Sequence, residues 1–451
     1  MSDDDYNFYA PGDYPANYPN VEQQYFLNAI GAKSEDSMRS FGNTEYFSYK
    51  SGPFYKGLSQ LELAAQYDFE KGVEILLDAQ IHPDNVAYDW NMPALCYAIL
   101  NDNLNMAKLL LKRGANPNAY YDYHEYHKNP TKKYPLGLAI EMDSPLFVHK
   151  LLKKGANPNV VHGDEPLIVL AAKKAHPCVI DLLAQKGADI NAKDKDGNTA
   201  LHIAALNGNI RLAKKLIEKY HANTLIQNNN KDLPMHMAMQ NPNIEVLKLL
   251  QKHGTPIYQE NIGKESVASL AVKSNNSEIL KTIFHWLRPY ESIYLKDPMI
   301  NSLLLSSIQS KSVVSTTHLL KHTPDLNAPI YEGMNPLQYI CEREDEQQLN
   351  ALLSFDGQLD INKQDNLGYT ALHYACKRQN KQMVLALLEK GADATLKNHF
   401  GEDSLFIAKQ TNNLDFLNFV KEAISTPNKA RLITKQPPLK SALNRTDRQN
   451  S

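Results

Sequence analysis

Apolar positions recur at helical spacing along most of the chain, in pairs of short segments separated by polar turns. The first segment of one pair carries small and apolar residues that would form one face of a short helix, namely Leu201, Ile203, Ala204 and Ala205. The second segment repeats apolar residues with the period of a helix: Ile210, Leu212, Ala213, Leu216 and Ile217. Between them, Gly208 tolerates positive φ and ends the first helix. The pattern predicts a unit of helix, turn and helix.

Polar segments connect one unit to the next. Before the pair just described, Gly187-Ala188-Asp189 closes a helix, and residues 191–197 are Asn, Ala, Lys, Asp, Lys, Asp and Gly. Gly, Asn and Asp favour turns because they tolerate a left-handed backbone or bond to their own main chain. We therefore expect a projecting, hairpin-like finger between consecutive helix pairs.

The unit recurs along the chain with a nearly constant period. Residues 197–205 read Gly-Asn-Thr-Ala-Leu-His-Ile-Ala-Ala, and residues 368–376 read Gly-Tyr-Thr-Ala-Leu-His-Tyr-Ala-Cys. Corresponding starts fall near residues 57, 91, 132, 164, 197, 231, 264, 300, 333, 368 and 401, and most are 33 or 34 residues apart. Such a period is typical of arrays in which each unit buries its apolar face against its neighbours. The chain is predicted to contain about eleven units.

These sequences resemble the ankyrin repeat over roughly residues 57–422. The resemblance implies an all-α fold, an ankyrin-repeat solenoid of about eleven helix-turn-helix units. It also implies a structural role for His202, His236 and His373, which share one slot of the unit and would bond to the turn through residues such as Thr199 and Thr370. These histidines are therefore not expected to act as bases or metal ligands.

Proteins that contain ankyrin repeats generally bind other proteins through their concave face and fingers. The divergent sequence of this array is rich in Asn, Lys, Ile and Tyr. It is also similar to ankyrin-repeat effectors that intracellular bacteria deliver into host cells. The resemblance therefore implies a non-enzymatic scaffold or adaptor for a protein partner. We expect this scaffold to be a monomer.

The flanking segments differ from the array in composition. Residues 1–20 combine Asp, Tyr and Pro and are predicted to be a disordered acidic tail. Residues 21–56 contain two helical patterns and are predicted to form a helical N-terminal cap on the array, which spans residues 57–425. Residues 426–451 hold six Lys and Arg against one Asp and are predicted to be a disordered basic tail. Both tails are expected to be flexible.

Charge and composition limit the classes of partner and the location that the sequence predicts. The formal net charge of −2 does not select nucleic acid or an anionic membrane, so nucleic acid is not expected as a partner. No apolar run reaches the ~20 residues that span a bilayer, and the acidic start at Met1 to Asp5 is unlike a secretory signal. We expect a cytoplasmic protein, or one secreted without a signal peptide into a host cell. The four cysteines do not form a disulfide framework, and we expect packed, reduced thiols.

Motifs for chemistry are missing from the chain. The sequence contains no phosphate-binding Gly-x-x-x-x-Gly-Lys loop, no Gly-x-Ser-x-Gly elbow and no His-Glu-x-x-His pair. We therefore expect no enzyme activity, no catalytic residues, no cofactor and no bound metal. Two alternatives stay open: an enzyme whose catalytic groups lie in the divergent units at residues 264–362, and a nucleic-acid-associated regulator that uses the basic tail.

One inter-unit segment is longer than the others. The starts at residues 91 and 132 are 41 residues apart, which inserts about eight residues into the finger. Insertions in such arrays map to loops on one face, often the binding face. The inserted segment is rich in tyrosine and contains Tyr120, Tyr121, Tyr123 and Tyr126. Tyrosine side chains are enriched at binding hot spots. This finger is predicted to bind the partner, and its alternative role is to pack onto the next helix.

Further candidate residues lie beside these tyrosines and on another finger. His124 and His127 are also predicted to contact the partner; their spacing could chelate a metal, but no cysteine lies nearby. A neighbouring tip carries alternating charges that would orient the partner, namely Lys193, Asp194, Lys195 and Asp196. Asn191 follows Leu183 by eight residues, which resembles the pattern of ankyrin fingers that are hydroxylated on asparagine in animal cells. Asn191 is therefore a candidate hydroxylation site.

Overall fold

The computed structural model describes residues 21–42, 58–88, 91–123, 131–174, 176–241, 243–287, 297–322, 325–355 and 357–425. The predictions made for the two tails, residues 1–20 and 426–451, lie outside these ranges. The chain divides into two compact units, Met1–Pro256 (unit 1) and Ile257–Ser451 (unit 2). Each unit is described by itself.

Unit 1 begins with two helices at the place of the predicted cap. Helices α1 (Val21–Gly31) and α2 (Glu35–Gly42) bury Phe26, Ile30 and Met38, and α2 packs on α4 of the first helix pair. These apolar residues cover one end of the helix stack. Terminal repeats of an array otherwise expose an apolar face to water. The role of these helices as a cap stays a prediction.

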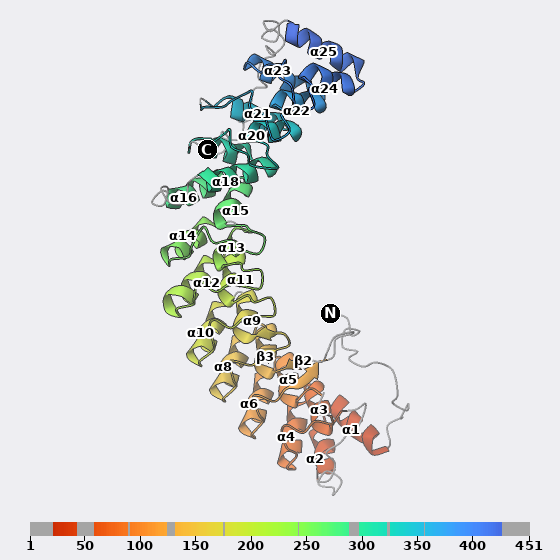
Figure 1. The fold of residues 1–451 in the computed structure, drawn as a ribbon. Coiled ribbons are helices and arrows are strands. Elements are labelled where there is room, and N and C mark those ends of the chain that lie inside the picture. Colours follow the sequence, from red (N-terminus) through yellow and green to blue (C-terminus); the bar gives the residue numbers. More distant parts are fainter. Residues whose placement is uncertain are drawn as a thin grey trace, which may run out of the picture. The chain divides into compact units, whose positions relative to one another are not determined.

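Six helix pairs follow in the described part of unit 1 (Figure 1). They are α3 (Gln60–Gln66) with α4 (Glu70–Asp78), α5 (Ala94–Leu100) with α6 (Leu104–Lys112), α7 (Pro135–Glu141) with α8 (Pro145–Lys153), α9 (Leu167–Lys173) with α10 (Pro177–Gln185), α11 (Ala200–Leu206) with α12 (Ile210–Lys214), and α13 (Pro234–Ala238) with α14 (Ile244–Lys252). Helix α12 continues as a π-helical turn, η2 (Lys215–Lys219). In each pair the second helix begins ten residues after the first.

Unit 2 contains five more pairs among its described residues. They are α15 (Val267–Lys273) with α16 (Ser277–Leu287), α18 (Asp297–Gln309) with α19 (Val313–Leu320), α20 (Pro336–Glu342) with α21 (Glu346–Leu353), α22 (Ala371–Lys377) with α23 (Lys381–Glu389), and α24 (Ser404–Gln410) with α25 (Leu414–Ser425). The same ten-residue offset places the regular start of the second pair at Leu303, so α18 begins six residues early. The predicted eleven units and the all-α class are confirmed.

A shared backbone turn sets the geometry of these pairs. The residue two positions after the first helix has a left-handed φ in most described pairs, for example Asp102 (+50°), Gly208 (+61°) and Gln379 (+57°). This turn ends the first helix and sends the chain back antiparallel. The prediction for Gly208 is confirmed, yet most units use Asp, Asn, Gln, Lys or Glu at this position, so the turn does not require glycine.

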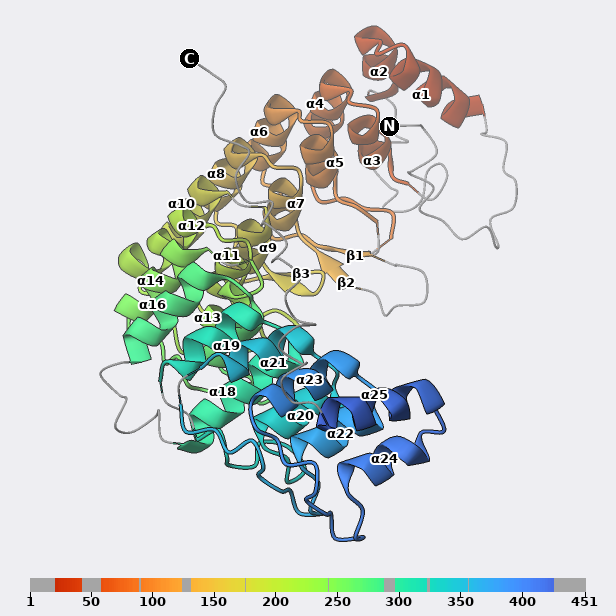
Figure 2. The same cartoon turned by 90° about the horizontal axis from the view of Figure 1, so that it is seen from above.

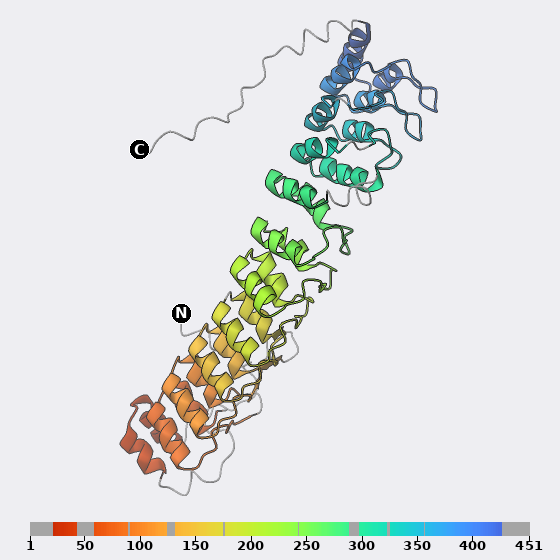
Figure 3. The ribbon, with the colours of Figure 1, turned by 90° about the vertical axis from the view of Figure 1, so that its left-hand side faces the viewer.

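Neighbouring pairs pack helix on helix. First helices contact first helices along each unit, and alanines at their centres, such as Ala98, Ala139, Ala171 and Ala204, have no exposed surface. Small residues allow this close approach. In unit 1 the second helices line one side of the stack, and the fingers project on the opposite side (Figures 2 and 3). The core is therefore a continuous layer within each unit, built from neighbour contacts alone.

The described residues hold two short β-hairpins, both on the finger side of unit 1. Strand β1 (Tyr121–Tyr123) pairs antiparallel with β2 (Thr131–Lys133), and β3 (Val161–His162) pairs with β4 (Glu165–Pro166). Strand β2 also contacts β3. The insertion predicted as a long finger is thus anchored by a paired hairpin.

Residues 264–362, where the enzyme alternative would require another fold, contain the helix pairs α15 with α16, α18 with α19 and α20 with α21 among the described positions. The first and third of these pairs have the ten-residue offset found in the clear repeats, and the second differs only in the early start of α18. These described residues belong to the repeat architecture and form no separate domain.

Candidate protein-interaction surface

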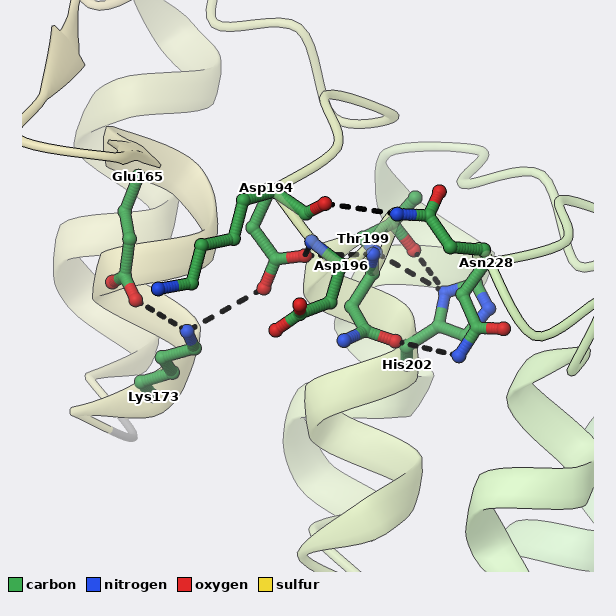
Figure 4. A network of polar contacts seen from close by, with 10 residues as sticks. Glu165, Lys173, Asp194, Asp196, Thr199, His202 and Asn228 are labelled. Atoms are coloured by element: carbon green, nitrogen blue, oxygen red, sulfur yellow. Dashed lines mark hydrogen bonds and ion pairs between the residues drawn. The ribbon is translucent and has the colours of Figure 1, made fainter.

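In five repeats the base of the finger is held by a buried polar side chain at the third position of the first helix, namely Glu62, His202, His236, Gln338 and His373. In α11 this side chain is His202, whose Nδ1 lies 3.2 Å from the Thr199 backbone nitrogen and 2.9 Å from Thr199 Oγ1 (Figure 4). Its Nε2 lies 3.1 Å from the carbonyl oxygen of Asp232 in the next unit. A carbonyl oxygen only accepts hydrogen bonds, so Nε2 carries the proton and Nδ1 accepts. Both ring nitrogens are thus occupied by the main chain.

The electrostatics of this slot agree with a structural role. Burial lowers the pKa of His202 to about 4, so the imidazole is neutral near pH 7. His373 repeats the arrangement with Thr370 and the carbonyl oxygen of Glu402, and burial lowers its pKa as well. His236 accepts a hydrogen bond from the Leu233 backbone nitrogen at 3.1 Å. The structural prediction for these three histidines is confirmed.

One unit fills the slot from outside, which the sequence analysis missed. Helix α7 has Gly137 at this position, and a Cβ added there would lie 2.0 Å from Nδ1 of His162. His162 belongs to β3 of the following finger and accepts a hydrogen bond from the Tyr134 backbone nitrogen at 3.0 Å. It therefore replaces the missing slot side chain. A small residue where other units carry a polar one is the signal that could have revealed it.

His162 also links this slot to the long finger. Its Nε2 lies 3.3 Å from Glu141 Oε1, and Lys133 Nζ of β2 donates to the same carboxylate at 3.0 Å. Burial alone would raise the pKa of Glu141, but the hydrogen bonds and charges of His162 and Lys133 outweigh it and lower the pKa to about 2. The ionised carboxylate fastens the β1–β2 hairpin to α7.

The tyrosines of the long finger do not share one environment. Tyr120 is 43% exposed, and Lys132 Nζ lies 4.1 Å from the centre of its ring. Tyr123 is half-buried, with Lys133 Nζ 4.7 Å from its ring centre. Tyr121 is only 7% exposed, and burial raises the pKa of its hydroxyl. Tyr120 and Tyr121 differ because consecutive residues of an extended chain point to opposite faces, whereas Tyr123 shares the face of Tyr121 and is less buried.

The burial of these tyrosines separates the predicted contact residues into buried and exposed ones. The expectation that Tyr121 offers its side chain to a partner is corrected, because that side chain packs inward, as the alternative role of the finger proposed. Tyr120 stays available on the surface. His124, Tyr126 and His127 lie outside the described residues.

The finger with alternating charges, residues 193–196, also has both exposed and buried side chains. Lys195 and Asp196 are exposed, and Lys193 is exposed while its Nζ donates to the Gln227 carbonyl oxygen at 2.8 Å. Asp194 is buried: its Oδ1 accepts from the backbone nitrogens of Asp196 at 3.1 Å and Asn198 at 2.8 Å (Figure 4). Its Oδ2 lies 3.4 Å from Lys173 Nζ.

These contacts assign a structural role to Asp194. Its carboxylate closes the finger turn and is turned away from solvent, so the expectation that it orients a partner is corrected. The alternating charge pattern in the sequence conceals this, because an aspartate that caps a turn and one that faces solvent look alike.

Asn191 lies in a ladder of asparagines that joins consecutive fingers. In unit 1, the side-chain oxygens of Asn118, Asn159 and Asn191 accept from the backbone nitrogens of Asn157, Asp189 and Asn223 at 2.7, 2.8 and 3.0 Å. In unit 2, Asn327 and Asn362 make the same bond to Asp360 and Asp393, both at 2.8 Å. The sequence analysis named Asn191 for modification only and missed this role. Its hydroxylation stays a prediction.

Two consecutive fingers of unit 2 carry an exposed apolar side chain at the tip. Leu367 is 53% exposed and Phe400 is 67% exposed. Each directly precedes a glycine with left-handed φ, Gly368 (+80°) or Gly401 (+79°), so they occupy the same tip position in consecutive fingers. Exposed apolar side chains at regular spacing favour contact with another protein. The 33-residue spacing of these two residues was the signal available in the sequence.

The cysteines are free thiols. Cys96, Cys341 and Cys376 are buried in first helices, as expected of packed residues, and burial raises the pKa of Cys376 to about 12. Cys178, at the start of α10, is exposed, so the packing expectation is wrong for this residue. Within the described residues, no group of three or more His, Cys, Asp or Glu side chains is arranged to hold a metal ion. The described helices include none that is both long and apolar enough to cross a bilayer.

Comparison with known proteins bears on the same repeats. A family model described as "Ankyrin repeats (3 copies)" matches residues 61–162, 136–228 and 303–398, which together make up more than half of the chain. Residues 229–302 fall between these matches, yet they include α13, α14, α15 and α16 with the regular offset. The family model therefore does not match α13 to α16, which the structure includes as regular helix pairs.

Several characterised proteins share part of this sequence. Inversin from Canis lupus familiaris is 27% identical over 183 residues, which cover 41% of this chain and 14% of inversin. The I-Kappa-B like protein C2 of Microplitis demolitor bracovirus (isolate Webb) is 40% identical over 89 residues, or 19% of this chain and 49% of that protein. The mitochondrial liver isoform of glutaminase from Mus musculus is 34% identical over 86 residues, or 19% and 14%. The chain thus spans half or less of the length of these relatives.

Proposed function

Because this chain belongs to the ankyrin-repeat family, we propose that it is a non-enzymatic scaffold or adaptor that binds a protein partner through its fingers and concave face. The supporting observation is how each finger is built. Buried groups such as His202 and Asp194 hold its base, while the tip side chains stay exposed. Rigid bases with free tips suit recognition, because little conformational entropy is lost when the tips bind.

Each unit has its own finger surface. In unit 1 we assign it to Tyr120, Tyr123, Lys193, Lys195 and Asp196, with the aromatic rings as anchors and the charges as orienting groups. In unit 2 we assign it to Leu367 and Phe400. Leu367 and Phe400 are more than half exposed.

An affinity capture with full-length protein tests the proposal. Tyr120→Ser with Tyr123→Ser disables the unit 1 finger surface, and Leu367→Ser with Phe400→Ser disables that of unit 2. The matched control is Leu414→Ser, which removes an equally exposed apolar side chain (69%) from the start of α25 and not from a finger. We expect a specific partner to be captured by the native chain and the control but lost with one finger variant, with binding weakened by at least about 2 kcal/mol.

Equal capture by all variants would reject the finger surfaces. Turnover of a small-molecule substrate by the chain would reject the non-enzymatic role and favour the enzyme alternative. Size-exclusion chromatography with light scattering tests the expected monomer, since a dimer would elute with twice the mass.

We further propose that the chain acts as an effector in the cytoplasm of a host cell, delivered by an intracellular bacterium. The composition of the array, rich in Asn, Lys, Ile and Tyr, supports this proposal. A reporter enzyme fused to the full chain tests it in infected cells. Reporter activity in the host cytoplasm is expected, and its confinement to the bacterium would reject the effector role.

A further inference from the structure

The second helices of unit 1 carry a large excess of positive charge. Helices α6, α8, α10, α12 with η2, and α14, each taken with the residue that follows it, hold 13 Lys and Arg against 3 Asp and Glu, a formal charge of +10. The whole chain has a formal charge of −2. The near-neutral total therefore conceals a strongly basic face, which we call the basic ridge.

Most of the ridge is exposed and without a counter-charge. Among the described residues, ion pairs are absent for Lys108, Lys112, Lys150, Lys153, Lys154, Lys186 and Lys252. The three acidic residues of the ridge are already paired: Asp181 with Lys215 and Lys219, Glu218 with Lys214, and Glu245 with Lys248. The positive field of the ridge is therefore not neutralised within the described chain.

The fold itself does not require this charge. A cation near a helix C-terminus is stabilised by the helix dipole, which could explain lysines in the last turns. Unit 2 has helices in the same position, α16, α19, α21, α23 and α25, and with their following residues these hold six basic against five acidic residues. Helix α4, the first second helix of unit 1, is net acidic. The ridge is thus an added property of α6 to α14.

The ridge has the dimensions of an extended chain. Its helices lie side by side along one side of unit 1, away from the fingers (Figures 1 to 3). Packed helices are spaced by about 8–10 Å, and an extended chain advances about 3.3–3.6 Å per residue. Three residues therefore span one step between helices, and roughly a dozen span the ridge. We propose that the basic ridge binds an extended acidic segment of a partner protein, with a carboxylate at about every third residue.

The side chains of the ridge favour this partner over other polyanions. Eleven of its 13 cations are lysines, which attract an anionic chain as point charges and need no bidentate geometry, so carboxylates spaced along an extended segment match them. Its described helices expose no Phe, Tyr or Trp on which bases could stack. Their one exposed large apolar residue is Leu146, at the start of α8, too little for insertion into a membrane interface.

Fluorescence anisotropy with the full chain tests the proposal. The probe is a labelled 15-residue peptide with Glu at every third position and Gly or Ser elsewhere, and its matched control has Gln in place of Glu. We expect saturable, salt-sensitive binding of the Glu peptide alone. The variant K112E/K153E/K186E should weaken binding at least about tenfold. The charge-matched variant K397E/K409E/K421E, which alters exposed lysines of unit 2, should bind as the native chain does.

Several outcomes would overturn the proposal. Unchanged binding by K112E/K153E/K186E, with circular dichroism showing a native fold, would reject the ridge as the site. Tighter binding of a 15-base-pair DNA duplex or of phosphatidylserine vesicles than of the Glu peptide would assign the ridge to another polyanion. Binding that is seen only after Asp3, Asp4, Asp5 and Asp13 are replaced by Asn would assign it to the chain's own N-terminal segment. The finger variant Y120S/Y123S should bind the Glu peptide normally, so ridge and finger surface can fail separately.

Discussion

Units 1 and 2 are built from the same helix pairs but differ in what they expose. Their first helices share the alanine layer, the left-handed turn and the buried slot that holds His202 in one unit and His373 in the other. Their second helices differ by nine charges, +10 along α6 to α14 against +1 in unit 2. Their fingers differ too, with a paired hairpin in unit 1 and apolar tips in unit 2.

The comparison separates two kinds of position. Buried residues recur from repeat to repeat, because each helix pair must fit the pair on which it packs. A mismatch leaves a cavity or an unpaired polar group. Exposed positions are free of this constraint and can diverge at little cost in stability. The differences between the units therefore indicate where binding properties reside, and the following experiments test that division.

The largest effect is expected at the shared core. Leu201 in α11 and Leu372 in α22 are both almost fully buried. Replacing either by Ala should cost about 2–5 kcal/mol, because the side chain leaves a cavity. Hydrogen exchange should show the loss of protection spreading from the altered pair to its neighbours while distant pairs stay protected. Denaturant melts that overlay the native curve would contradict the equivalence of these two positions.

The buried slot should make stability depend on pH. The pKa of His202 is about 4 in the folded chain and about 6.5 when exposed after unfolding. Between these values the unfolded chain binds a proton that the folded chain does not. Stability should therefore fall as the pH drops from about 6.5 to 4, by up to about 3 kcal/mol. Urea melts across this range measure the loss.

The chain offers a matched control for this effect. Gln338 fills the same slot in α20: its Oε1 accepts from the Asn335 nitrogen at 2.7 Å, and its Nε2 donates to the carbonyl oxygens of Lys363 and Tyr369 at 2.9 and 2.8 Å. His202→Gln should thus keep most of the stability at pH 7 and flatten the loss below pH 6.5. An unchanged pH profile in this variant would show that another group titrates.

The borrowed histidine of unit 1 gives a third test. Gly137→Ala should destabilise the chain by about 1–3 kcal/mol, because the new methyl group overlaps the His162 ring. The double variant Gly137→Ala with His162→Ala removes the overlap, so its cost should be less than the sum of the two single costs. Strictly additive free energies of unfolding would mean that the ring and the glycine are not coupled.

The finger tips should matter least to folding. Tyr120→Ser in unit 1 and Leu367→Ser in unit 2 should each change the free energy of unfolding by less than about 0.5 kcal/mol, since both side chains are exposed. Tyr121→Ser, at the neighbouring residue in β1, is the buried control and should lower the melting temperature clearly. A large loss with Tyr120→Ser would place this ring in the packed core and remove it from the finger surface.

Asparagine modification would have the smallest effect on stability and compares the two units directly. Asn191 has Leu183 eight residues before it, whereas Asn362 has Ser354 at that position. In animal cells that contain an asparaginyl hydroxylase, mass spectrometry should find an added oxygen on the Asn191 peptide and none on the Asn362 peptide. An unmodified Asn191 would remove the prediction, and the ladder bond to Asn223 gives a reason why access to it could be restricted.

Much of the fold could be predicted because its information is local and repeated. The ten-residue offset between paired helices follows from one turn and two short apolar patterns. Eleven copies make this pattern recognisable even where single copies are unclear. The sequence could not reveal the early start of α18 or the π-helical turn η2, since both depend on neighbouring helices. The division into two units lies at the pairs that the repeat pattern describes least well.

The candidate surface was less accessible to sequence reasoning. Tyr120 and Tyr121 are identical residues side by side, and only the pairing of β1 with β2 decides which of them faces solvent. Asp194 and Asp196 are likewise alike in sequence, yet one carboxylate closes a turn and the other is exposed. The formal charge of −2 gave no sign of a strongly charged face, because a total does not record where charges lie.

The sequence by itself determined the helix pairs, their number and the slots that pack, because periodic apolar patterns and turn residues act over a few neighbouring positions. Only the tertiary structure decided which polar side chains form hydrogen bonds or ion pairs within the molecule and which remain exposed to a partner. It brought His162 onto Gly137 from the next finger and aligned the lysines of five separate helices into one ridge. Such arrangements join residues that are about one repeat apart, and hydrogen bonds and charges act through space, not along the chain.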